Sequence, residues 1–192
     1  GTEEQMRAQA SNRANAIFTS AQTRVQGLLE PLPGTAMRRW QTGVDLLSTR
    51  FEQSLARVQR WLDERYSGVG GAVLEFAESI VGKPDWVAEA YNAAELEFAE
   101  GVCDLIREIS TEVNGVIATC ETIIDEANTE IAEVFDGLPE SLQEWAAGEQ
   151  AGFAERLQGL QQEVQSTRED LNSGLAERAA ESVQQVRERI HE

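Results

Sequence analysis

The spacing of apolar residues between positions 86 and 135 constrains the fold of this chain more than any other feature. These residues follow one another in steps of three and four, which places them on one stripe of an α-helix. At about 1.5 Å per residue, such a helix is roughly 75 Å long. That length is typical of a coiled-coil-like bundle. The stripe consists of Phe98, Val102, Leu105, Ile109, Val113, Val116, Cys120, Ile124, Ala127, Ile131 and Val134.

The same helical spacing recurs in four other stretches of the chain. No stretch shows the alternation of apolar and polar residues that is typical of a strand, so the pattern predicts an all-α fold. Segments that contain glycine or proline separate the stretches. The helical stretches are 3–29, 36–66, 72–81 and 140–192, and the separating segments are 30–35, 67–71, 82–85 and 136–139.

Short links between long helices predict antiparallel helical hairpins. We expect a long hairpin over 84–192, with two helices of about 50 residues and its turn at Asp136–Pro139. A shorter N-terminal hairpin is expected over 1–66, turning at Pro31–Gly34. Residues 67–83 are expected to form a glycine-rich hinge and a short helix.

Residues with known roles at helix ends mark the predicted boundaries. Thr35 and Asp85 are suitable N-caps. Gly137 can adopt the left-handed conformation that often ends a helix. Pro139 suits the first turn of the following helix, where its missing N–H costs nothing.

Eight glycines fall inside the predicted helices, and each costs about 0.5–1 kcal/mol relative to alanine. Gly148 and Gly152 share one face of their helix, so they can permit a close approach of two helices or mark a bend. These helices must therefore be held by packing. The eight are Gly27, Gly43, Gly101, Gly115, Gly148, Gly152, Gly159 and Gly174.

Composition argues against several classes of function. The chain of 192 residues carries a formal charge of −18, so nucleic acid is not an expected partner. Its one histidine, His191, and its two cysteines do not make the usual zinc or haem site, and we expect no cofactor. Cys103 and Cys120 are expected to be reduced core residues, because 17 residues of one helix separate them by about 25 Å. An intermolecular disulfide is the alternative.

Acidic residues are concentrated in one part of the chain. Residues 84–140 hold fifteen of them and a single basic residue, Arg107. Many recur at helical spacing and form a stripe opposite the apolar one. The stripe is Glu97, Glu100, Asp104, Glu108, Glu112, Glu121, Asp125, Glu130 and Glu133.

Three interpretations of this acidic stripe remain open. It can be a solvated face, or a docking surface for a basic partner. It can also pair within the chain, with four arginines that recur in the second helical stretch. These are Arg50, Arg57, Arg60 and Arg65.

The motifs of common catalytic sites are missing from this sequence. A catalytic triad needs an internal histidine, and a ferritin-like di-iron site needs Glu-x-x-His pairs. The glycine-rich run 68–71 follows no predicted strand and precedes no Gly-Lys-Ser/Thr, so it indicates a hinge and not a phosphate-binding loop. We therefore expect a protein that is not an enzyme.

Two stretches give the sequence a more specific likeness. Gly101-Val102-Cys103-Asp104-Leu105-Ile106-Arg107-Glu108-Ile109 and Leu138-Pro139-Glu140-Ser141-Leu142-Gln143-Glu144-Trp145-Ala146 resemble a helical region of large bacterial proteins associated with extracellular contractile injection systems. Those proteins carry a zincin-like metalloprotease domain elsewhere. The resemblance covers 84–185. Because no His-Glu-x-x-His occurs here, it implies no protease activity for this segment.

The resemblance implies a helical spacer, scaffold or loading module of a secreted bacterial effector. Its expected partner is a protein, basic in charge, such as an injection-particle component or another part of the parent chain. The chain opens with Gly1-Thr2 and shows no signal peptide, so we expect a fragment made in the cytoplasm and packaged in an extracellular particle.

Two alternatives belong to other classes of protein. One is a membrane-active helical toxin, with 69–74 as the tip that enters the bilayer. An acidic polar face argues against it, because anionic lipids attract lysine and arginine. The other is an adaptor coiled coil that associates with itself.

Overall fold

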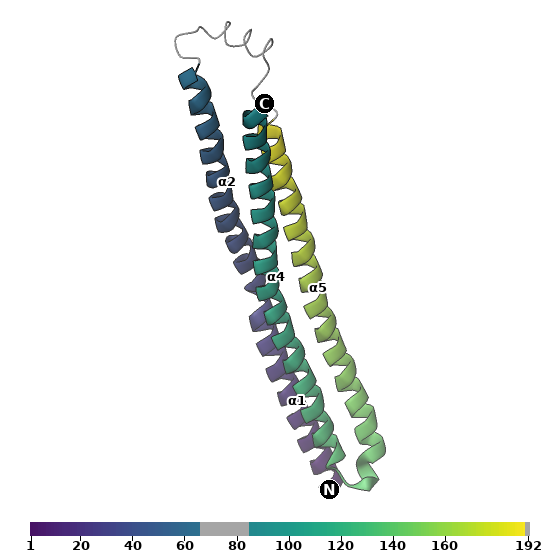
Figure 1. Ribbon diagram of the computed structural model, residues 1–192. Coiled ribbons are helices and arrows are strands. Elements are labelled where there is room, and N and C mark those ends of the chain that lie inside the picture. Colours follow the sequence, from purple (N-terminus) through teal and green to yellow (C-terminus); the bar gives the residue numbers. More distant parts are fainter. Residues whose placement is uncertain (66–84, 191–192) are drawn as a thin grey trace. The chain divides into compact units, whose positions relative to one another are not determined.

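The structure is a computed structural model that describes residues 1–65 and 85–190, without the side chains at 58, 59, 61–65 and 85–88 (Figure 1). The described residues are almost entirely helical and include no strand, which confirms the all-α prediction. The elements are α1 (Thr2–Leu29), α2 (Leu32–Arg65), α4 (Asp85–Asp136), the short 3-10 helix η1 (Glu140–Leu142) and α5 (Gln143–Ile190).

Two helices have the predicted length of about 50 residues: α4 has 52 and α5 has 48. The predicted hinge and short helix at 67–83 lie outside the described residues, as does His191. The chain divides into two compact units. Unit 1 contains residues 1–36 and 110–173, and unit 2 contains 37–109 and 174–192.

Unit 1 is built from three helical segments, namely α1, the second half of α4 and the first part of α5. The Ser141 hydroxyl donates a hydrogen bond to Glu3 (3.1 Å), and the Arg156 guanidinium donates one to Asn15 (3.2 Å), so α1 runs parallel to α5. The turn at 137–142 makes α4 and α5 antiparallel. The result is a three-helix bundle with an apolar centre.

Unit 2 repeats this arrangement with α2, the first half of α4 and the end of α5. Arg189 donates a hydrogen bond to Glu52 of α2 (3.4 Å), and Arg187 donates one to Glu95 of α4 (2.7 Å). The rings of Phe51 and Phe98 meet edge to face between α2 and α4, with centroids 6.0 Å apart. Among the described residues, the core of either unit contains no buried polar or charged side chain.

The N-terminal hairpin is not formed, because the chain does not turn back at Pro31–Gly34. Glu30 has helical dihedral angles (φ −57°, ψ −47°), and the Thr35 N–H donates to the Pro31 carbonyl (3.0 Å), as in a helix. Thr35 therefore lies inside α2 and is not its N-cap. Since α1 packs in unit 1 and α2 from Met37 onward packs in unit 2, they are not the two arms of one hairpin.

The predicted turn between α4 and α5 is present, but its chemistry differs from the prediction. Gly137 does not adopt a left-handed conformation, and its N–H donates to the Glu133 carbonyl (3.2 Å) as in a helix. Pro139 is the N-cap of η1. The Gln143 side chain supports the turn by donating a hydrogen bond to the Leu138 carbonyl (2.7 Å).

Most of the predicted α4 stripe is buried, with differences at its edges. Leu105, Val116 and Val134 are half-buried, whereas Ile117, Ile123 and Phe135 are buried although the predicted stripe omitted them. A bundle buries α4 against two neighbours, so its apolar face is wider than a single seam.

Close helix approach occurs at glycines other than the predicted pair. A Cβ added to Gly148 or Gly152 would meet no heavy atom within 4 Å. A Cβ on Gly43 of α2 or Gly101 of α4 would instead overlap a leucine of the facing helix. At Gly43 and Gly101, therefore, the absence of a side chain is what lets the two helices approach closely.

Candidate functional site

The acidic stripe lies on α4 as its spacing predicts, and each unit holds part of it. Within unit 2, Glu97, Glu100, Asp104 and Glu108 are all exposed. They follow one another at three- and four-residue intervals along a regular helix, so they present one continuous row of carboxylates.

Unit 1 holds the other five residues of the stripe. Glu112, Asp125, Glu130 and Glu133 are exposed. Glu121 departs from the row, because it is half-buried and accepts a hydrogen bond from Gln165 of α5 (2.9 Å).

Pairing within the chain accounts for little of the stripe's charge. Asp104 is 3.3 Å from Arg107 of the same helix, and Glu108 is 3.6 Å from Arg39 of α2. Pairs as exposed as these contribute little to stability. In the part of the chain that the structure describes, six of the nine carboxylates have no basic group within 4.0 Å, namely Glu97, Glu100, Glu121, Asp125, Glu130 and Glu133.

The predicted pairing with the arginines of the second helical stretch does not account for the stripe. Arg50 and Glu97 border the same small hollow between α2 and α4 without forming an ion pair. Arg57 and Arg60 are exposed, and the side chain of Arg65 lies outside the described residues. Arg39 of α2, which the sequence did not single out, does reach the stripe, at Glu108.

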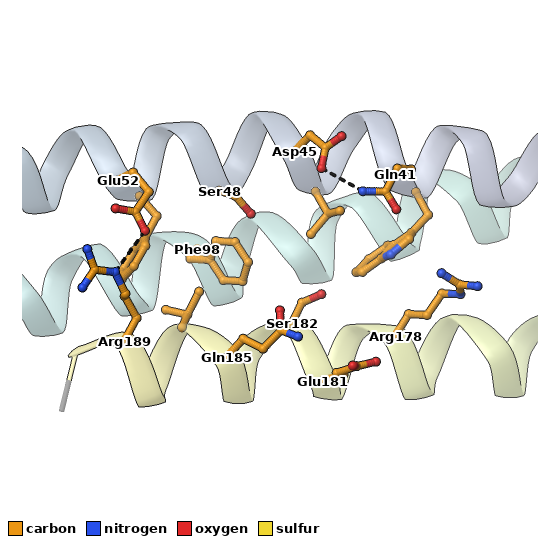
Figure 2. A pocket seen from close by; sticks show the side chains of 14 residues that line it. Gln41, Asp45, Ser48, Glu52, Phe98, Arg178, Glu181, Ser182, Gln185 and Arg189 are labelled. Atoms are coloured by element: carbon orange, nitrogen blue, oxygen red, sulfur yellow. Dashed lines mark hydrogen bonds and ion pairs between the residues drawn. The ribbon is translucent and has the colours of Figure 1, made fainter. Parts of the chain in front are cut away.

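A groove of about 420 Å³ lies between α2 and α5 in unit 2 (Figure 2). Its floor is apolar and includes Trp40 and Phe98. Figure 2 shows polar side chains of both helices along its rims, with the Glu52–Arg189 pair bridging one end and Gln41 bonded to Asp45 on α2 (2.8 Å). These pairs already engage some of the hydrogen-bonding groups on the rims of the groove.

A second groove lies between α1 and α4 in unit 1, and we call it the α1–α4 groove. It consists of two adjoining hollows of about 600 and 280 Å³, which share Ala16, Ile17 and Glu130. Arg13 and Arg24 line it from α1. The sequence analysis did not identify this groove, although the 11-residue spacing of the two arginines places them on one side of a helix.

The two cysteines have different environments. Both are free thiols. Cys120 is buried, and burial, with a smaller effect from the charge of Glu121, raises the pKa of its thiol. Cys103 is exposed, so the prediction that it belongs to the core is wrong.

Among the described residues, no cluster of three or more histidine, cysteine, aspartate or glutamate side chains has an arrangement suited to a metal ion. Within the same residues, no helix combines the length and the apolar character needed to cross a membrane. What the site offers is an extended, charged helical surface, suited to electrostatic contact with another macromolecule.

Comparison with known proteins identifies no relative of this chain, so the resemblance to injection-system proteins stays a prediction. No protein family, no curated protein and no solved structure matches this chain.

Proposed function

We propose that this chain is a non-enzymatic helical module, a spacer or loading element of a larger bacterial effector, that binds a basic protein partner on α4. The observation that carries the proposal is the exposed row Glu97, Glu100, Asp104 and Glu108 in unit 2, in which Glu97 and Glu100 form no ion pair with any residue whose side chain the structure describes. A row of like charges on one helix face is unfavourable by itself. A partner with matching positive charges relieves that repulsion.

An exposed leucine beside the row supports a protein partner over mere solvation. Leu96 of α4 is 59% exposed and lies one turn before Glu100. A surface that combines carboxylates with an apolar side chain suits a basic amphipathic segment, whose apolar residues cover the leucine. The charges then steer association, and binding weakens as salt rises.

The resemblance at 101–109 and 138–146 indicates which partner to test first. We expect a fusion of residues 1–192 to an inert reporter to co-purify with contractile injection particles from a host that makes them. The variant Glu97→Gln/Glu100→Gln/Asp104→Asn should lose most of that association. A matched control, Glu155→Gln/Glu163→Gln/Glu169→Gln, removes three exposed charges from α5 and should bind like the parent chain.

Two outcomes would count against the proposal. If the fusion does not co-purify, the module is not a loading element for these particles. If both triple variants lose association equally, binding reflects the overall negative charge and not the row on α4.

A further inference from the structure

The three helix pairs of unit 1 differ in the polar side-chain contacts that link their helices at the surface. Arg156 of α5 bonds to Asn15 of α1 and lies over the ring of Phe18, with its guanidinium carbon 4.2 Å from the centroid. Glu121 of α4 bonds to Gln165 of α5. Within the described residues, no hydrogen bond or ion pair crosses the α1–α4 groove. Among the described residues, the α1–α4 pair is therefore the one whose surface groove is not bridged by a polar contact.

The groove has an apolar floor that the bundle covers incompletely. Met6 and Ile17 of α1, Val134 of α4 and Leu138 just after α4 are each half-buried. The lining of α1 extends from Met6 to Arg24, which is about 27 Å at the helical rise of about 1.5 Å per residue. An apolar strip of that length can be covered by another helix pair.

The rims of the groove carry opposite charges that have no ion pair. Arg13 and Arg24 stand on the α1 side, and Glu126, Glu130 and Glu133 stand on the α4 side. None of these five has an opposite charge within 4.0 Å among the described residues. Their net charge is −1, although unit 1 as a whole holds 17 acidic and 5 basic residues. Because its net charge is small, this groove should not strongly repel a second copy of the chain.

We propose that the occupant of this groove is a second copy of the chain, which forms a parallel homodimer through α1 and α4 of unit 1. A symmetric dimer places one surface patch against itself, so that each contact occurs twice. A two-fold axis parallel to the helices sets α1 of one copy opposite α4 of the other at the same level. The half-buried apolar residues of both copies then cover one another.

Charge selects this orientation over the antiparallel one. Arg13 borders the same hollow as Glu130, and Arg24 borders the same hollow as Glu126. In the parallel dimer, Arg13 therefore faces Glu130 of the partner subunit, and Arg24 faces Glu126 of the partner subunit. In the antiparallel dimer, whose two-fold axis is perpendicular to the helices, α1 of one copy would face α1 of the other. The arginines of the two copies would then face each other. The dimer is independent of the proposed basic partner, whose surface lies in unit 2.

Charge reversal in complementary variants tests the dimer with the full chain. One variant carries Arg13→Glu/Arg24→Glu, and the other carries Glu126→Lys/Glu130→Lys. Analytical ultracentrifugation over micromolar to near-millimolar concentration should show a dimer for the parent chain. Each variant alone should dimerise about tenfold or more weakly, because both of its rims carry the same sign. An equimolar mixture should restore a dimer, because opposite rims then face each other.

The lysine variant separates the proposal from a general charge effect. It reduces the net negative charge of the chain, so non-specific repulsion alone would make it associate more strongly than the parent. The proposal requires the opposite result. A control with Glu155→Lys/Glu163→Lys, which alters exposed positions of α5 by the same charge, should dimerise at least as well as the parent.

Three results would overturn the proposal. They are a parent chain that is monomeric across the whole range, a parent dimer that neither variant weakens, and a mixture that stays monomeric. Because Arg13, Arg24, Glu126 and Glu130 are exposed, the variants should keep the parent's helical content, and circular dichroism verifies that weak association is not caused by unfolding.

Discussion

Gly43 of α2 lies directly against Leu105 of α4, so that a Cβ atom added to Gly43 would be 2.5 Å from Leu105 Cδ1. The same relationship occurs in reverse one turn away, where a Cβ on Gly101 would be 2.4 Å from Leu47 Cδ2. In each of α2 and α4, a glycine therefore leaves the space that a leucine of the other helix fills. Both contacts are closer than real Cβ atoms permit, so a larger residue must displace its neighbour.

We expect Gly43→Ala to lower the free energy of unfolding by about 1–3 kcal/mol, which is typical of overpacking. Helix propensity alone would raise stability by about 0.5–1 kcal/mol. Gly115→Ala is the matched control, because a Cβ there meets no heavy atom within 4 Å. It should be stabilising. Urea denaturation measures both, and a Gly43→Ala protein as stable as the parent would contradict the close contact.

Phe135 should be one of the most important side chains in unit 1. It is fully buried, and its ring centroid is 6.0 Å from those of both Trp145 and Phe153. Phe135→Ala should cost about 3–5 kcal/mol, because it leaves a cavity as well as losing apolar burial. Phe135→Leu keeps more of the volume and should cost clearly less. Thermal unfolding compares the two, and similar losses would mean that the aromatic cluster is not well packed.

Gln143 should stabilise the turn between α4 and α5. Its side-chain amide donates to the carbonyls of Leu138 (2.7 Å) and Phe135 (3.4 Å). Gln143→Ala should lower the free energy of unfolding by about 0.5–1.5 kcal/mol and speed amide exchange in the turn. Gln143→Glu should do no better, because a carboxylate cannot donate. Gln162→Ala, at an exposed position of α5, should have almost no effect.

The two thiols should react at very different rates. A thiol reagent should modify the exposed Cys103 in the folded protein and reach the buried Cys120 only on unfolding. Cys103→Ser should abolish the fast reaction. Rapid modification of Cys120 in the folded Cys103→Ser protein would show that unit 1 opens readily.

Cys120 should also make stability depend on alkaline pH. Burial raises the pKa of its thiol above the ordinary value of 9.0, so the folded state retains the proton to higher pH than the unfolded state. Its contribution is complete below that value and is lost as pH rises through the folded-state pKa. The free energy of unfolding should therefore fall above pH 9.0. Urea titrations at several pH values measure this, and Cys120→Ala should remove that part of the decline.

The long helices could be predicted because their signal is local and repeated. The apolar steps of α4 continue over many turns, so isolated exceptions such as Gly101 and Gly115 did not obscure them. What the pattern could not show was how many neighbours α4 has. Burial of Phe135 and Ile123 beside the expected stripe results from packing against two helices at once.

The turn predicted at Pro31–Gly34 was wrong for a physical reason. Proline breaks a helix in its interior but is tolerated in its first turn, where the missing N–H has no partner to lose. The two prolines therefore mark the start of α2 without reversing the chain. Leu29 and Leu32, which lie on either side of Pro31, are both buried. Tertiary packing of this kind is not visible in local sequence.

The acidic stripe was predictable from spacing, but its individual environments were not. Glu121 has the same local pattern as its neighbours, and only the approach of Gln165 from α5 distinguishes it. The α1–α4 groove depends on residues more than 100 positions apart, such as Arg13 and Glu130. The charges could be read from the sequence, whereas their opposition across a groove needed the structure.

The glycine–leucine contacts also bear on how α2 and α4 choose their alignment along one another. Coiled coils often use a buried polar residue for this purpose, and the described core of unit 2 has none. Here the discrimination is steric. Sliding the antiparallel helices by one turn in one direction would bring Leu47 against Leu105, and sliding them in the other would leave Gly43 facing Gly101. The first slip would crowd two leucines and the second would leave a void, so these contacts favour the observed register of the two helices.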